Sequence, residues 1–164
     1  MANTGKPKRA LVFFSAMLAS AFVLNWIWEM AQANAYVAHP GMLRRCTLAS
    51  FADAAITAAI YAVGALATKR LLWATTRTWN VYLTCAVLGF VYAVLVERHA
   101  IAAHRWVYSE TMPVIPALQA GLWPVLQLTL LVPVSVWFGG ASLACWVRGH
   151  DTYRRNTVSS ERKF

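Results

Sequence analysis

Residues 10–32 read ALVFFSAMLASAFVLNWIWEMAQ, an apolar run that turns polar only near its end. A transmembrane helix needs about 20 consecutive, mostly apolar residues, and this run is long enough. Three more runs of this kind follow, so we expect four spans, at about 10–36, 48–68, 80–100 and 120–147. The predicted fold is therefore all-α: a polytopic membrane protein whose four transmembrane helices form an up-down bundle.

The composition agrees with a membrane protein. Of the 164 residues, 59% are hydrophobic and 13% are charged, and the mean hydropathy is +0.49. That is too apolar for a soluble domain of this size. We expect one transmembrane domain over residues 1–147 and a basic tail over residues 148–164.

Most positive charge lies in the two termini and in the connection between the second and third spans. These regions hold eleven of the 15 Lys and Arg residues, and the other two connections hold four. The positive-inside rule then predicts that both termini lie in the cytoplasm. We expect the protein to be integral to the cytoplasmic (inner) membrane. The tail is expected to contact anionic membrane lipids, and no nucleic acid is expected as a partner.

The N-terminus has an alternative interpretation as a cleaved signal. Basic residues 6–9, the apolar run and the A-x-A sequence at 33–35 imitate a signal peptide with its cleavage site. The apolar region is long for a signal, and Trp28 and Glu29 are unusual so near a cleavage site. We predict a retained first span, which N-terminal sequencing would test.

Three cysteines are scattered along the chain: Cys46, Cys85 and Cys145. None belongs to a C-x-x-C motif or a zinc-ligand spacing. We therefore interpret them as small apolar packing residues.

The acidic residues Glu29, Asp53 and Glu97 are the leading candidates for a functional role. An acidic side chain at the centre of a transmembrane helix costs about 2.5 to 3.5 kcal/mol, so such residues usually have a function. Because consecutive spans alternate in direction, all three fall near the outer face of the membrane, and so does Gln127 of the fourth span. We predict that they share a pocket beneath loop 98–119 and assign the three acids as catalytic candidates.

Polar and aromatic residues surround this predicted pocket. Asn25, Glu29 and Gln32 follow the spacing i, i+4, i+7 and therefore lie on one helix face. The candidates for substrate binding are Asn25, Trp28, Gln32, His104, Trp106, Tyr108, Trp123 and Gln127.

Two of the acids also have a structural interpretation. Asp53 follows residues 47–50, where we expect the second span to begin, so it is equally a candidate helix cap. Glu97 is also a candidate for an ion pair at the interface, with Arg44, Arg98 or Arg105. Glu29 has no basic residue near it in sequence, so we expect its carboxyl group to be hydrogen-bonded, protonated or bound to a ligand.

The aromatic and imidazole side chains of the loop also have two interpretations. Trp106 and Tyr108 suit either interfacial anchors or the mouth of a pocket. His99 and His104 are five residues apart, share no helix face and are more simply solvated than ligands.

A metal site built from the three acids and one histidine is chemically possible, since carboxylate and imidazole suit iron, manganese or zinc. The helical carboxylate-bridged pattern needs Glu-x-x-His, and residues 97–100 read ERHA. We predict no metal, and no cofactor can be named. The polar residues reach only half-way across the bilayer, which argues against an ion conduction path.

A set of short motifs runs along the chain: Asn25-x-x-Trp28-Glu29-x-x-Gln32, Asp53, Glu97, Arg105-Trp106-x-Tyr108, Met112-Pro113, Pro116 and Gly121-Leu122-x-Pro124-x-x-Gln127. They resemble a group of small, uncharacterised four-span bacterial inner-membrane proteins over nearly the whole chain. From the third span onward, their order is similar to membrane carotenoid-modifying proteins of the lycopene cyclase and carotenoid hydratase type. That resemblance implies a lipophilic substrate, although the cyclase type has paired acids after the proline, where this chain has Gln127.

Three classes of function fit the sequence. The first is an enzyme or binding protein for an apolar isoprenoid-like or carotenoid-like lipid, with Glu29 as the candidate acid for alkene chemistry. The second is a non-enzymatic subunit or assembly factor with a membrane-protein partner, and the third is a proton or metal-ion carrier. Mass spectrometry of the lipids and metals retained by the native protein would separate them.

Overall fold

The computed structural model describes residues 5–37, 41–76 and 78–161. Its elements are α1 (Gly5–Gln32), η1 (Ala33–Ala35), α2 (Met42–Thr68), η2 (Trp73–Thr76), α3 (Trp79–Ala102), β1 (Val114–Ile115), β2 (Ala120–Gly121) and α4 (Leu122–Glu161). All four α-helices are long and apolar enough to cross a membrane. The predicted all-helical class is confirmed, and the strands form only a two-residue antiparallel ladder.

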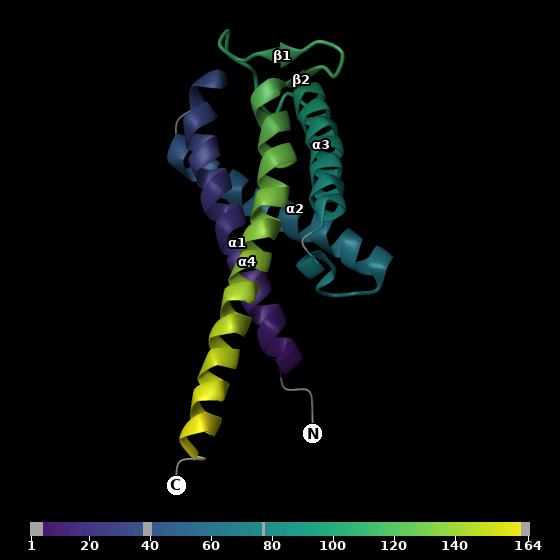
Figure 1. Ribbon diagram of the computed structural model, residues 1–164. Coiled ribbons are helices and arrows are strands. Elements are labelled where there is room, and N and C mark those ends of the chain that lie inside the picture. The colour runs from purple at the N-terminus through teal and green to yellow at the C-terminus, as the bar shows by residue number, and fades with distance from the viewer. Residues whose placement is uncertain (1–4, 38–40, 77, 162–164) are drawn as a thin grey trace.

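Helix α4 organises the molecule. It packs along α1 on one side and along α3 on the other, whereas α2 packs chiefly against α1 and makes few contacts with α3 or α4. Figure 1 shows α3 and α4 rising to the end that carries β1 and β2, with both chain termini at the opposite end. We call these the loop end and the terminal end. Because α2 and α3 barely touch, space is left between them.

Helix α2 begins earlier than its sequence suggests. Gly41 precedes it with a φ of +79°, a left-handed conformation that suits glycine, and the helix starts at Met42. The hydroxyl groups of Thr47 and Ser50 donate to helix carbonyl oxygens one turn back and cap nothing. The expected start at residues 47–50 is therefore wrong, and Asp53 lies well inside the helix. The capping interpretation of Asp53 is wrong for the same reason.

Helix α4 continues to Glu161, so the predicted basic tail begins as an extension of this helix. Pro124 falls in the first turn, where its missing N–H has no helical partner to lose. Arg162 and Lys163 of the predicted tail, and Arg77 of the connection before α3, lie outside the described residues.

The terminal half of the bundle is filled by aromatic and apolar side chains. The ring of Tyr61 packs within 5.6 Å, centroid to centroid, of the rings of Phe13, Phe14 and Trp73. Tyr61 donates its hydroxyl to the Leu71 carbonyl oxygen at 2.9 Å, and the indole of Trp73 donates to the Tyr61 carbonyl oxygen at 3.1 Å. Each buried polar group here thus has a partner.

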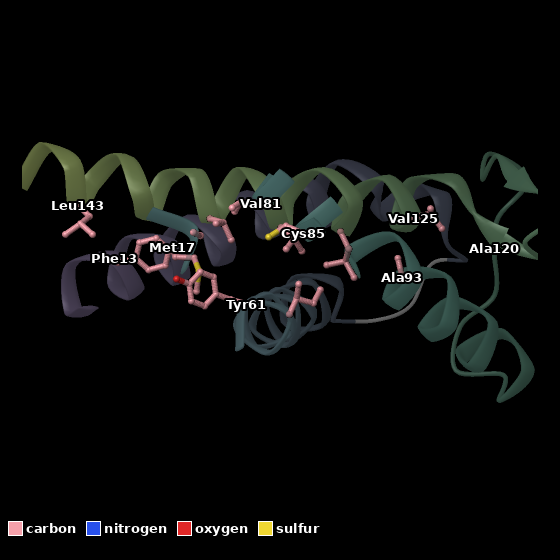
Figure 2. Packing of buried hydrophobic residues seen from close by; sticks show 14 residues of the cluster. Phe13, Met17, Tyr61, Val81, Cys85, Ala93, Ala120, Val125 and Leu143 are labelled. Carbon is pink, nitrogen blue, oxygen red and sulfur yellow. The ribbon is translucent and has the colours of Figure 1, made fainter. Parts of the chain in front are cut away.

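Glycine permits this packing, because a Cβ atom on Gly64 would lie 2.2 Å from the Trp73 ring. The buried apolar cluster extends along α4 from Leu143 at the terminal end to Ala120 at the loop end (Figure 2).

The cysteines divide between two environments. Cys46 and Cys85 are buried, as expected of packing residues. Cys145 is exposed on α4, with its sulfur 3.5 Å from an Arg148 nitrogen, so the packing interpretation is wrong for this residue.

Candidate functional site

A cavity of about 780 Å³ occupies the space between α2 and α3 at the loop end. Its walls are residues of α2 between Met42 and Ile56 and of α3 between Tyr92 and His99. On α4, Pro124, Gln127 and Leu128 line it. Sites for small molecules usually measure about 300 to 1,000 Å³, so this cavity has the size of a ligand site.

Two of the apolar side chains that line the cavity are strongly exposed. Leu48 of α2 and Leu95 of α3 both line it, and they are 56% and 62% exposed. Exposed leucines on the two helices that flank a gap mark an apolar entrance between them. This entrance lies in the side of the bundle, where α2 and α3 separate.

The three acids predicted to share a pocket do line this one cavity. Glu29 comes from α1, Asp53 from α2 and Glu97 from α3. No ion pair joins any of them to a cation among the side chains that the structure describes. The alternative interpretation of Glu97, as a member of an ion pair with an arginine, is therefore wrong, since its partner among the described residues is Tyr108.

Gln127 connects two of these acids. Its side-chain nitrogen lies 3.1 Å from a Glu29 oxygen, 2.9 Å from an Asp53 oxygen and 2.9 Å from the Asn25 oxygen. An amide nitrogen has only two N–H groups, so three acceptors compete for two donors. Glu29 and Asp53 thus lie close together around a single amide, and Asn25 completes the cluster from one helical turn away.

Gln32 extends this network toward the end of α1. Its nitrogen donates to Glu29 at 3.1 Å and to the Gln127 oxygen at 2.8 Å, and its own oxygen accepts from Trp28 at 3.2 Å. Trp28 and Trp123 line a second cavity of about 410 Å³, and Gln32 lines it too. These two tryptophans therefore do not belong to the cavity that holds the acids.

Glu97 is bound through Tyr108. The phenol donates to a Glu97 oxygen and accepts from the backbone N–H of Gly121 at 2.7 Å. Loss of solvation raises the pKa of the Tyr108 phenol, and its bond to Glu97 adds to the rise. The phenol therefore stays a donor through the neutral range and fixes the Glu97 carboxyl group at the beginning of α4.

Aromatic side chains cover the cavity at the loop end. Tyr36 and Trp106 both line it, with ring centroids 6.3 Å apart at nearly a right angle. Backbone hydrogen bonds from Val37 to Val107 and from Ser109 to Ala35 hold this cover in place, each at 3.0 Å. The cover thus ties the end of α1 to the loop after α3.

Trp106 carries an unsatisfied donor. Its indole nitrogen is buried and has no hydrogen-bond partner among the described residues. It is close enough to Glu97 to interact with the carboxyl group, but the geometry falls short of a hydrogen bond. A buried N–H without a partner costs about 1 to 3 kcal/mol, so this group favours an acceptor that enters the cavity.

Basic side chains line the same cavity, a feature that the sequence interpretation missed. They are Arg45 near the start of α2, His99 near the end of α3 and Arg105 in the loop that follows. His104, a predicted binding residue, lines neither this cavity nor the second one; it is exposed with a φ of +51°. Only a tertiary structure reveals which of these basic side chains line the cavity.

Within the described residues, no three His, Cys, Asp or Glu side chains come together as a metal-binding group. Comparison with known proteins adds no assignment: no protein-family model, no curated protein and no solved structure matches this chain.

Proposed function

We propose that this chain is a polytopic membrane protein that binds an apolar, isoprenoid-like lipid in the cavity between α2 and α3 and acts on it through the carboxyl groups. The observation that carries this proposal is the cavity itself, which is lined mostly by apolar side chains and holds Glu29, Asp53 and Glu97 together. Three acids without a cation partner are costly to place in a membrane, and acidic residues at such positions usually have a function.

The entrance supports a ligand that arrives from the bilayer. In an up-down bundle with both termini in the cytoplasm, the loop end faces outward, and the gap between Leu48 and Leu95 opens into the outer leaflet. An apolar molecule then enters sideways without crossing water. A water-soluble substrate has no need of such an entrance.

The carboxyl pair of Glu29 and Asp53 supports acid catalysis on an alkene. A protonated carboxyl group donates its proton to one alkene carbon, which leaves a carbocation on the other. A carboxylate then removes a proton from a neighbouring carbon, and the double bond has moved without any oxidant or reductant.

The terminal half argues against an ion carrier. Beyond Ile56 most of the buried side chains are apolar or aromatic, and the buried hydroxyl groups of Thr57 and Ser135 donate to backbone carbonyl oxygens of their own helices. A conduction path needs polar groups across the whole bilayer. Liposome flux that disappears in a Glu29→Ala variant would contradict this conclusion.

Native mass spectrometry of the protein in mild detergent tests the proposal. We expect one apolar lipid per chain in the wild type and its loss in Ala49→Phe, which fills the cavity. Ala55→Phe makes the same change on an exposed part of α2 that does not line the cavity, and it should keep the lipid. A wild-type protein without lipid, or with a stoichiometric protein partner in its place, would refute the proposal and favour a membrane-complex subunit.

Catalysis is tested separately. If the bound lipid is turned over, Glu29→Gln should bind it but convert it at least about tenfold more slowly, which corresponds to losing one proton-transfer interaction. Unchanged turnover would remove Glu29 from the role of acid.

A further inference from the structure

Basic side chains meet an unsatisfied donor at one edge of the cavity. Arg45 approaches from α2, and Arg105 approaches from the loop after α3, next to Trp106. Both arginines are exposed, and neither forms an ion pair with any described acid. Two guanidinium groups without an ion pair and a buried indole N–H all donate hydrogen bonds, and the carboxyl group beside the indole, that of Glu97, already accepts from Tyr108.

We propose that the lipid bound in the cavity carries an oxyanion head group, a phosphate or a carboxylate, held by Arg45, Arg105 and the indole N–H of Trp106. The inference rests on the function proposed above and specifies its ligand. Guanidinium groups bind such oxyanions through paired hydrogen bonds, which are stronger than those to a neutral oxygen. An oxygen of the same head group also satisfies the Trp106 donor.

The geometry of α2 separates the head group from the reacting part of the ligand. Arg45, Ala49 and Asp53 follow the spacing i, i+4, i+8, so they lie along one helix face, and all three line the cavity. With a rise of about 1.5 Å per residue, Asp53 lies about 12 Å deeper than Arg45 along the helix axis. A ligand that reaches both therefore has a charged head and an extended tail. Free phosphate alone cannot span this length.

Glu97 is the acid that most directly faces this head group, because it lies beside Trp106 and is bound by Tyr108. A negative charge on Glu97 would repel an oxyanion and weaken its binding. The Glu97→Gln variant removes that repulsion and keeps an acceptor for Tyr108. We therefore expect Glu97→Gln to bind an oxyanion lipid at least as tightly as the wild type does.

Calorimetric titration of the full chain in neutral detergent tests the inference with four probes. Hexadecyl phosphate and palmitate supply the two oxyanion heads, hexadecanol supplies the same chain with a neutral head, and inorganic phosphate supplies a head alone. We expect at least one of the two charged lipids to bind, hexadecanol to bind about 10- to 100-fold more weakly, as expected on losing charged hydrogen bonds, and inorganic phosphate not to bind. The charged lipid that binds more tightly identifies the head group.

Matched arginine variants localise the effect. Arg45→Gln and Arg105→Gln should each lower the affinity for the charged lipid about tenfold or more. Arg44→Gln and Arg98→Gln remove equally exposed neighbours that do not line the cavity, and they should change affinity less than about twofold. Trp106→Phe should weaken binding while keeping an aromatic ring in the cover.

The outcomes separate failure of this inference from failure of the proposed function. If hexadecanol binds as tightly as the charged lipids, or if Arg45→Gln behaves like Arg44→Gln, the oxyanion head group is refuted while lipid binding stands. If no long-chain probe binds and Ala49→Phe behaves like the wild type, the proposed function itself fails.

Discussion

The two halves of the bundle use the same four helices in opposite ways. At the terminal end, Tyr61 and Trp73 fill the interior, and their polar atoms are paired with nearby carbonyl oxygens. At the loop end, α2 and α3 separate around a cavity of about 780 Å³, where the acids Glu29 and Asp53 share the amide of Gln127. The contrast teaches that this polar cluster is not a by-product of loose packing. Side chains fill the interior of one half, whereas the other leaves a cavity between α2 and α3.

The largest expected effect comes from breaking the terminal half. Tyr61→Ala removes a fully buried ring together with its hydrogen bond to Leu71. Such a change should lower the free energy of unfolding by about 3 to 5 kcal/mol, measured by unfolding in mixed micelles. Trp79→Ala removes an aromatic side chain that is 77% exposed and should cost far less. Equal losses in the two variants would mean that the aromatic cluster does not stabilise this end.

Gln127→Leu should lower the free energy of unfolding less than Tyr61→Ala does. It should release more of the bound lipid. The variant removes the donor that the oxygens of buried Asn25 and half-buried Asp53 share with Glu29, which keeps its bond from Gln32. Unpaired buried groups of this kind cost about 1 to 3 kcal/mol, and the retained lipid should be lost as the cluster rearranges.

Ser135→Ala is the matched change on the terminal half of α4, because this buried hydroxyl only donates to the Leu131 carbonyl oxygen. It should leave lipid retention unchanged. If both α4 variants keep their lipid in native mass spectrometry, the Gln127 cluster plays no part in binding.

The smallest expected effect belongs to Tyr108→Phe, which removes one hydroxyl between Glu97 and Gly121. We expect a loss of about 1 to 2 kcal/mol near neutral pH. Because the folded-state pKa of Tyr108 is raised above the ordinary value of 10.0, the contribution is fully present below pH 10 and should shrink as the pH rises beyond it.

Unfolding titrations of Tyr108→Phe and the wild type between pH 7 and 11 measure this change. Tyr82→Phe serves as the control, since its hydroxyl makes no hydrogen bond among the described residues. A difference between wild type and Tyr108→Phe that stays constant above pH 10 would contradict this role of the phenol.

Much of this contrast could be predicted from sequence. Alternating spans place Glu29, Asp53, Glu97 and Gln127 at one level, and helical spacing puts Asn25 and Gln32 on the face of Glu29. The structure joins five of these side chains, all but Glu97, in one hydrogen-bonded network around Gln127, and Glu97 lines the same cavity as Glu29 and Asp53. These relations follow from periodicity and direction alone, which is why no tertiary information was needed.

The remaining features depend on how the helices are oriented against one another. The apolar pattern does not reveal the start of α2, because Arg44 and Arg45 interrupt the apolar run. The helix nevertheless starts at Met42, directly after Gly41. Trp28 and Trp123 meet at a second cavity because their helix faces point away from Asp53 and Glu97. The basic edge depends on the separation of α2 from α3, which no local pattern encodes.

Thiol labelling of the wild-type protein tests the central contrast most directly, because one cysteine lines the cavity, one lies in the packed core and one is exposed. Cys46 lines the cavity, Cys85 lies in the apolar core with no exposed surface, and Cys145 is exposed. With an apolar maleimide and site-resolved mass spectrometry, we predict fast labelling of Cys145, slower labelling of Cys46 and none of Cys85 in the folded protein. Ala49→Phe or a bound long-chain lipid should protect Cys46 alone. Labelling of Cys85 as fast as Cys46, or a Cys46 rate that neither change affects, would contradict an open cavity above a sealed core.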